Sequence, residues 1–183
     1  MKDLYVRVYL TNMRKYNEGQ LIGGWVDVST DTDWSKELKN FCRIGIGKDD
    51  VFGEEYFISD YETNINDLNI SEYTSISELE NVAEFIEYVN LNDLQDIANE
   101  LIEAIGGIDI YRLMRLLENE QYVYIADAGD DEKLGEYIIE NDAKYSSLSD
   151  DIKHYLDKEA IGSDYCINNG GIYQNGNYIE LLG

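Results

Sequence analysis

Two stretches in the middle of the chain decide its fold, SELENVAEFIEYV (77–89) and LQDIANELIEAI (94–105). Apolar residues recur in both at intervals of three and four, which places them on one face of an α-helix. They are Leu79, Val82, Ala83, Ile86 and Val89 in the first stretch, and Leu94, Ile97, Ala98, Leu101, Ile102 and Ile105 in the second. The sequence therefore predicts two amphipathic helices, the first beginning with a capping box between Ser77 and Glu80.

A third helix is predicted over residues 109–119. The second helix is expected to end at Gly106–Gly107, because glycine commonly follows a helix C-terminus. Beyond it, the inward-facing positions are taken by Ile110, Leu113, Met114 and Leu117. Three short helices in succession predict a small helical bundle, which we assign to a central domain of residues 63–120.

The region before these helices alternates between strand and helix signals. LYVRVYL (4–10) is typical of a strand, and a turn-like segment (12–20) connects it to a second predicted strand (21–28). Asp31 is the expected cap of a helix over 32–42, which places Trp34, Leu38 and Phe41 on one face. A strand is expected near 55–61. Residues 1–62 are thus predicted to form an N-terminal mixed sheet and helix domain.

The last third, residues 121–183, is predicted to be a mixed helix and strand domain. We expect a strand over 122–126, a helix over 130–141 with Leu134, Tyr137 and Ile138 inward, and a helix opened by Ser149 with Ile152, Tyr155, Leu156 and Ala160. Asn175–Gly176 between β-prone residues predicts a hairpin. The expected fold class is α+β, with three small abutting domains in an elongated molecule.

The net charge separates this chain from an ordinary globular protein. It has 38 Asp and Glu against 14 Lys and Arg, a formal charge of −24. Residues 1–60 carry a net −3, residues 61–120 a net −12 and residues 121–183 a net −9. Such a field repels nucleic acid and anionic membranes and favours basic partners. Solubility and adaptation to high salt are the simpler explanations that composition leaves open.

Carboxylates also form ordered rows on the predicted helices. Their members are Glu80, Glu84 and Glu87 in the first helix, and Asp93, Asp96, Glu100 and Glu103 in the second. Like charges at these spacings destabilise a helix by about 0.2–0.5 kcal/mol per pair, and lysine is absent from residue 49 to residue 132. An ordinary solvated face remains the alternative. The rows favour a functional reason, such as contact with the basic groove of a DNA-binding protein.

No residue pattern predicts catalysis or a cofactor. His154, the single histidine, has no nucleophile motif around it and is expected at the surface or half-buried. Asp127, Asp130, Asp131 and Glu132 do not fit a calcium loop, so we expect no metal site. Gly45–Ile46–Gly47 lacks the third glycine of a dinucleotide site. Cys42 is expected in the core, and its distance from Cys166 fits no metal or redox spacing.

The order of several segments resembles the ArdA-type antirestriction proteins. The matching pieces are VYLTN (8–12), KYNEG (15–19) and GGW (23–25), ISDYE (58–62), EYTSISEL (72–79) and YLDKEAIGSD (155–164). YIADAGDDE (124–132) with YIIE (137–140) looks like the family's antirestriction motif. Members tend to have an aromatic residue where this chain has Lys158 and arginine where it has Ser163, so nothing is carried over for that segment.

The resemblance implies a non-enzymatic inhibitor. It implies an elongated, curved homodimer of three-domain chains joined through the C-terminal domain. It further implies that surface Asp and Glu imitate B-form DNA and occupy the DNA-binding site of type I restriction–modification enzymes. The partner acids expected from the rows and the motif are Glu80, Glu84, Glu87, Asp93, Asp96, Glu100, Glu103, Asp127, Asp130, Asp131 and Glu132.

Three classes of function therefore remain to be separated. The leading hypothesis is DNA mimicry. The runner-up is an acidic binding module for another basic DNA- or RNA-binding protein, and the third is an enzyme that uses paired carboxylates. A cytoplasmic location is expected, because no apolar run approaches the length of a membrane helix and the N-terminus lacks the pattern of a signal peptide.

Overall fold

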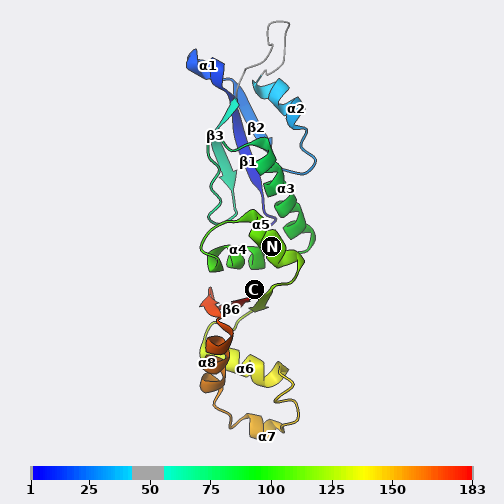
Figure 1. The fold of residues 1–183 in the computed structure, drawn as a ribbon, viewed down its shortest axis with the longest axis vertical. Helices are drawn as coiled ribbons and strands as arrows, with labels where there is room; N and C mark the ends of the chain where they lie inside the picture. The colour runs from blue at the N-terminus through cyan, green and yellow to red at the C-terminus, as the bar shows by residue number, and fades with distance from the viewer. Residues whose placement is uncertain (1, 43–55, 183) are drawn as a thin grey trace. The chain divides into compact units, whose positions relative to one another are not determined.

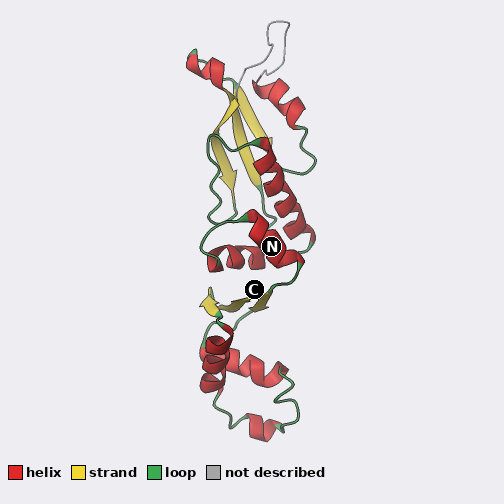
Figure 2. Ribbon diagram, viewed as in Figure 1, coloured by secondary structure: helices red, strands yellow, loops and turns green. Residues whose placement is uncertain are grey.

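The computed structural model describes residues 2–42 and 56–182 and has an α+β fold (Figure 1). The described residues form two three-stranded antiparallel sheets with helices around them (Figure 2). The chain divides into two compact units, Met1–Gln95 and Asp96–Gly183. The α+β class is as predicted, whereas the three domains with boundaries at 62 and 120 stay a prediction.

The first unit is organised by a sheet with the strand order β2-β1-β3. Its strands are β1 (Val6–Asn12), β2 (Gly23–Asp27) and β3 (Tyr56–Thr63). Both pairings are antiparallel, and the register between β1 and β3 shifts at Tyr9 and Leu10. The predicted strands are therefore present, with shifted ends, but the expected turn at 12–20 contains a short helix, α1 (Met13–Asn17).

The helix predicted over 32–42 is present in a different form. It begins two residues later than expected, because the Asp33 carboxylate, not that of Asp31, caps it by accepting a hydrogen bond from the Lys36 amide at 3.0 Å. Helix α2 (Trp34–Glu37) then continues as a π-helical turn over Leu38–Cys42. Trp34 is buried, as an inward-facing position requires. The proposed role of Cys42 and the glycines near residue 45 lie outside what the structure describes.

Helix α3 (Ile76–Leu91) supplies most of the helical core of the first unit and runs along its sheet (Figure 1). All five predicted inward residues are buried, and Phe85 joins them. The capping box lies two residues before its predicted position: the Ser75 amide donates to Glu78 at 2.7 Å, and Ser75 Oγ accepts from the Glu78 amide at 3.2 Å. At its other end, the Asn90 side chain binds the backbone of Leu4 twice: its Oδ1 accepts from the Leu4 N–H, and its Nδ2 donates to the Leu4 carbonyl.

The second unit contains the remaining helices and a sheet with the order β4-β6-β5. Helices α4 (Gln95–Ala104), which starts at the unit boundary, and α5 (Ile110–Glu118) match the predicted pair. The strands are β4 (Tyr122–Ile125), β5 (Ile172–Gln174) and β6 (Asn177–Leu181). The hairpin predicted at Asn175–Gly176 is confirmed, because both residues have the positive φ angles, 49° and 85°, that its two-residue turn requires.

Two helices in the second unit cross at glycines. A Cβ on Gly135 of α6 (Asp131–Asn141) would lie 1.9 Å from the carbonyl oxygen of Lys158, and one on Gly162 of α8 (Lys158–Asn169) would lie 1.9 Å from that of Asp131. Only hydrogen at these positions lets the two backbones approach so closely. The core beside them is formed by Ile125, Ala128, Leu134, Ile138, Tyr145 and Tyr178.

The single helix predicted from Ser149 is wrong. The chain instead forms the short helix α7 (Asp150–Lys153), leaves helical geometry, and begins α8 where the Asp157 carboxylate accepts from the Ala160 amide. Because the predicted face is broken there, Ile152 and Tyr155 are exposed. Tyr137 was also predicted to face inward, but it is exposed while Ile139 takes a buried place on α6.

Candidate partner-binding surface

The acidic row of α3 is ordered and faces solvent. Glu80, Glu84 and Glu87 are all exposed, on the side of the helix opposite the buried Leu79 and Val82. Consecutive members are separated by about one helical turn, or roughly 5 Å along the axis. Within the described residues, no ion pair involves any of the three, and the sequence has no lysine or arginine between Lys48 and Arg112. Their negative charge is therefore directed at solvent.

A groove of about 210 Å³ runs beside this row in the first unit. One wall is formed by Glu80, Ala83 and Glu84 of α3, and the other by Ser29, Thr30, Thr32 and Trp34. Hydroxyl groups and carboxylates therefore face the same space. Such a lining accepts hydrogen bonds from amine or guanidinium groups, which carry donors only.

The row predicted on the second helix is not a single row. Helix α4 begins at Gln95, so Asp93 lies in the preceding turn, where its φ of 55° is left-handed. The prediction that Asp93 shares a helix face with the other acids is therefore wrong. The error arose because the apolar period begins at Leu94, whereas the backbone turns left-handed just before it. Asp96 and Glu103 are exposed on α4.

Glu100 was predicted to face outward with them, but it is only 8% exposed. Its carboxylate accepts hydrogen bonds from three side-chain amides of the β5–β6 hairpin, at 2.6 Å from Gln174, 3.2 Å from Asn175 and 3.0 Å from Asn177. Gln174 Nε2 also reaches the backbone carbonyl of Glu100. This carboxylate therefore holds the hairpin on α4, a role that helical spacing did not reveal.

The acids near residue 130 also have unequal environments. Asp127 is exposed in a left-handed turn, and its amide donates to the Asn177 side chain at 3.1 Å. Asp130 caps α6 and forms an ion pair with Lys133. Asp131 accepts a hydrogen bond of 2.6 Å from the Tyr173 hydroxyl. Glu132 is exposed. Asp127 and Glu132 are therefore the members of this segment most open to a partner.

Two tyrosines of the second unit have raised pKa values, mainly because they are partly buried and secondly because acidic groups lie near them. Burial, followed by the charges of Glu100, Asp96 and Asp127, raises the pKa of Tyr124 above its ordinary value. Burial, followed by the hydrogen bond to Asp131, raises the pKa of Tyr173 still further. Both phenols stay protonated at neutral pH, so neither adds charge to the surface.

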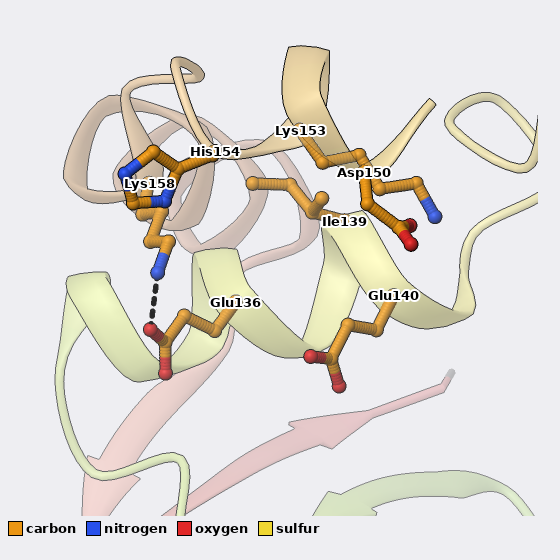
Figure 3. A pocket seen from close by; sticks show the side chains of 7 residues that line it. All are labelled: Glu136, Ile139, Glu140, Asp150, Lys153, His154 and Lys158. Atoms are coloured by element: carbon orange, nitrogen blue, oxygen red, sulfur yellow. Dashed lines mark hydrogen bonds and ion pairs between the residues drawn. The ribbon is translucent and has the colours of Figure 1, made fainter. Parts of the chain in front are cut away.

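A mixed-charge pocket of about 280 Å³ lies between α6, α7 and the start of α8 (Figure 3). Lys158 extends across it to donate a hydrogen bond to Glu136, and this contact raises the pKa of the lysine. Glu140, Asp150 and Lys153 line the rest. His154, at its rim, is exposed and has a ring contact with Tyr155. The pocket contains one ion pair, between Lys158 and Glu136, and its lining residues include no nucleophile activated by a base.

Sequence reasoning missed the anchoring role of Gln174, Asn175 and Asn177. The sequence marks only Asn175, as part of the turn, and the common partner of the three side chains lies more than 70 positions earlier. Within residues 2–42 and 56–182, no three His, Cys, Asp or Glu side chains gather as metal ligands. No helix in the same part of the chain is long and apolar enough to cross a membrane.

The fold and its surface define an acidic α+β protein whose most regular surface feature is a row of exposed carboxylates on α3. A family model described as "Antirestriction protein (ArdA)" matches residues 8–180, nearly the whole chain, while a search of curated proteins gives no match. The chain belongs to the ArdA family of antirestriction proteins. The family consists of non-enzymatic inhibitors, which confirms the prediction that the chain is not an enzyme, and membership implies a restriction enzyme as the target.

Proposed function

We propose that this protein inhibits type I restriction–modification enzymes by presenting carboxylates in place of DNA phosphates. The observation that carries the proposal is the α3 row, because three exposed carboxylates follow one another on a rigid helix with no ion-pair partner among the described residues. A DNA-binding groove is lined by Lys and Arg that neutralise phosphates. The same groups are complementary to an ordered carboxylate row.

The structure changes the set of acids that we propose for this contact. Glu80, Glu84 and Glu87 remain its best-defined members, with Asp93, Asp96, Asp127 and Glu132 as further exposed candidates. Glu103 is also exposed, although it accepts a hydrogen bond from Asn175. Glu100 holds the hairpin, and Asp130 and Asp131 are engaged within the second unit. Their carboxylates give up internal hydrogen bonds if they turn to a partner, so their contribution to binding is smaller.

We further propose that the functional form is a homodimer joined through the C-terminal residues. The second unit exposes apolar and aromatic side chains that support this arrangement, namely Tyr137, Ile152, Tyr155 and Ile167. Exposed aromatic and aliphatic groups of this kind are enriched at subunit interfaces. Analytical ultracentrifugation of the full chain tests the proposal, and a monomer at all accessible concentrations rules it out.

Competition with DNA tests the inhibitory mechanism directly. A fluorescent DNA duplex containing the recognition site is bound to a type I methyltransferase, and anisotropy is followed as this protein is added. We expect the DNA to be displaced, with an affinity for the inhibitor that falls steeply as salt rises. If the enzyme is inhibited while its DNA stays bound, mimicry is wrong. If this enzyme is unaffected but another basic protein loses its nucleic acid, the acidic-module alternative is correct.

Substitution of the α3 row tests whether this row is the surface that binds the enzyme. Changing Glu80, Glu84 and Glu87 to glutamine removes three exposed charges without changing side-chain size. We expect the inhibition constant to rise at least about tenfold, because close charge pairs at an interface contribute about 1.5 kcal/mol or more each. The matched control changes three other exposed acids, Glu118, Asp151 and Asp164, to their amides. Equal inhibition by the two variants shows that net charge, rather than this row, is recognised.

A further inference from the structure

The N-terminal sheet has a second face, which carries a different chemistry from the α3 row. Alternation along β1 buries Val6, Val8 and Leu10 and turns Arg7 and Tyr9 to the opposite face. Residues paired directly across antiparallel strands share a face. Trp25 lies opposite Tyr9 on β2, and Asp60 lies opposite it on β3. Phe57 lies opposite Thr11, and Asp27 and Glu62 flank Arg7.

Four aromatic side chains lie on this surface as two contacting pairs, and we call it the aromatic face: Tyr9, Tyr16, Trp25 and Phe57. Tyr9 contacts Trp25 edge-on, with ring centroids 5.4 Å apart, and Tyr16 of α1 contacts Phe57 in the same way at 5.1 Å. None of the four is fully buried, and Tyr16 is 54% exposed. Aromatic clusters that remain partly open to solvent are enriched at sites of protein–protein contact.

The chain itself shows which chemical group this face accepts. The guanidinium of Arg7 lies 4.8 Å from the centre of the Trp25 ring, and the same side chain is 3.8 Å from both Asp27 and Glu62. A cation is therefore stacked on an aromatic ring and bordered by carboxylates. Tyr9, with Asp60 opposite it on β3, offers the same combination of a ring and a carboxylate, and Tyr16 and Phe57 add further rings on this face. No cation–π contact to these three rings occurs among the described residues.

We propose that the aromatic face is a second partner-binding surface, which takes arginine side chains of the target enzyme by stacking them on Tyr9, Tyr16 and Phe57 beside Asp60. The choice of enzyme rests on the proposed inhibitory function. Arginine fits better than lysine because its planar guanidinium stacks on a ring while its N–H groups bind a carboxylate. This surface binds through aromatic area as well as charge, so its contribution persists at salt concentrations that screen the α3 row.

The contribution of the aromatic rings to binding is isolated by a substitution that keeps apolar area but removes the ring. The test variant combines Tyr16→Leu with Phe57→Leu, and the matched control combines Tyr16→Phe with Phe57→Tyr, which keeps both rings. Affinity for the type I methyltransferase is measured by calorimetry at low and at high salt, with circular dichroism to verify folding. We expect the leucine variant to bind about tenfold more weakly at both salt concentrations, and the control to bind within about twofold of the wild type.

Two outcomes overturn the proposal: equal binding by the leucine variant and the wild type, or equal losses in the leucine variant and the ring-keeping control. If circular dichroism shows that the leucine variant is unfolded, Asp60→Asn with Tyr16→Leu replaces it, and the same criteria apply. A failure of the proposed function has a different signature, because wild-type protein then leaves the DNA complex of the methyltransferase intact. A wild type that displaces DNA, with a leucine variant that does so equally well, rejects the aromatic face alone.

Discussion

Helices α3 and α4 have nearly the same acidic spacing and use it differently. On α3, Glu80 and Glu84 project into solvent, whereas on α4 the corresponding central acid, Glu100, is 8% exposed and bound by three amides. Periodicity places a side chain on a helix face, but it does not say what lies against that face. A row of like charges is therefore a candidate surface only after each member's surroundings are known.

The largest difference between the two helices is expected in stability. Glu100→Ala removes the acceptor of the Gln174, Asn175 and Asn177 amides and leaves polar groups of the hairpin without partners. We expect the free energy of unfolding to fall by about 3 kcal/mol, since breaking a buried charged network has costs of this size. Urea denaturation measures it. Glu84→Ala is the matched control and is expected to change it by less than about 0.5 kcal/mol.

The donor side of the same network is expected to have a smaller effect. Asn177→Ala removes one amide from Glu100 and also the oxygen that accepts from the Asp127 backbone. We expect a loss of about 1–2 kcal/mol, because two other amides still reach the carboxylate. In a double-mutant cycle with Glu100→Ala, the two losses should be less than additive. Full additivity contradicts direct coupling.

Alanine substitution tests whether Asp93 lies outside α4, unlike Asp96, through its effect on stability. Alanine tolerates a left-handed backbone less well than aspartate, so Asp93→Ala is expected to lower the free energy of unfolding by about 1 kcal/mol. Asp96→Ala, within α4, is expected to change it by less than about 0.5 kcal/mol. Thermal denaturation of both variants provides the comparison. Equal effects show that Asp93 is helical after all.

The smallest effect is expected on α3. In Glu84→Lys, the repulsion of residue 84 by Glu80 and Glu87 becomes attraction. We expect a gain in stability of about 0.5 kcal/mol, together with weaker inhibition of the target enzyme. Calorimetric unfolding and the DNA competition assay measure the two effects. A variant that is more stable and equally inhibitory indicates that the acids of α3 serve solubility.

Much of the fold was predictable because its signals are local. The apolar period identified α3, α4 and α5, and Asn175–Gly176 identified the final hairpin. Errors arose where a cap or a break depends on a single hydrogen bond, as at Asp33 and at Asp157. The candidate site was predicted less well. The exposed acids of α3 follow from its amphipathic pattern, but the burial of Glu100 depends on amides from a distant segment.

The anchoring of the hairpin also affects how the protein is synthesised. Glu100 leaves the ribosome 74 residues ahead of Gln174, a delay of about 4–15 s at ordinary rates of translation. The first unit is compact by itself, and all of its residues, Met1–Gln95, are synthesised before Glu100. At that stage α4 has been synthesised, but the hairpin amides that bind Glu100 have not. Nascent α4 therefore remains open to other contacts until the hairpin arrives, which makes completion of this unit a late event.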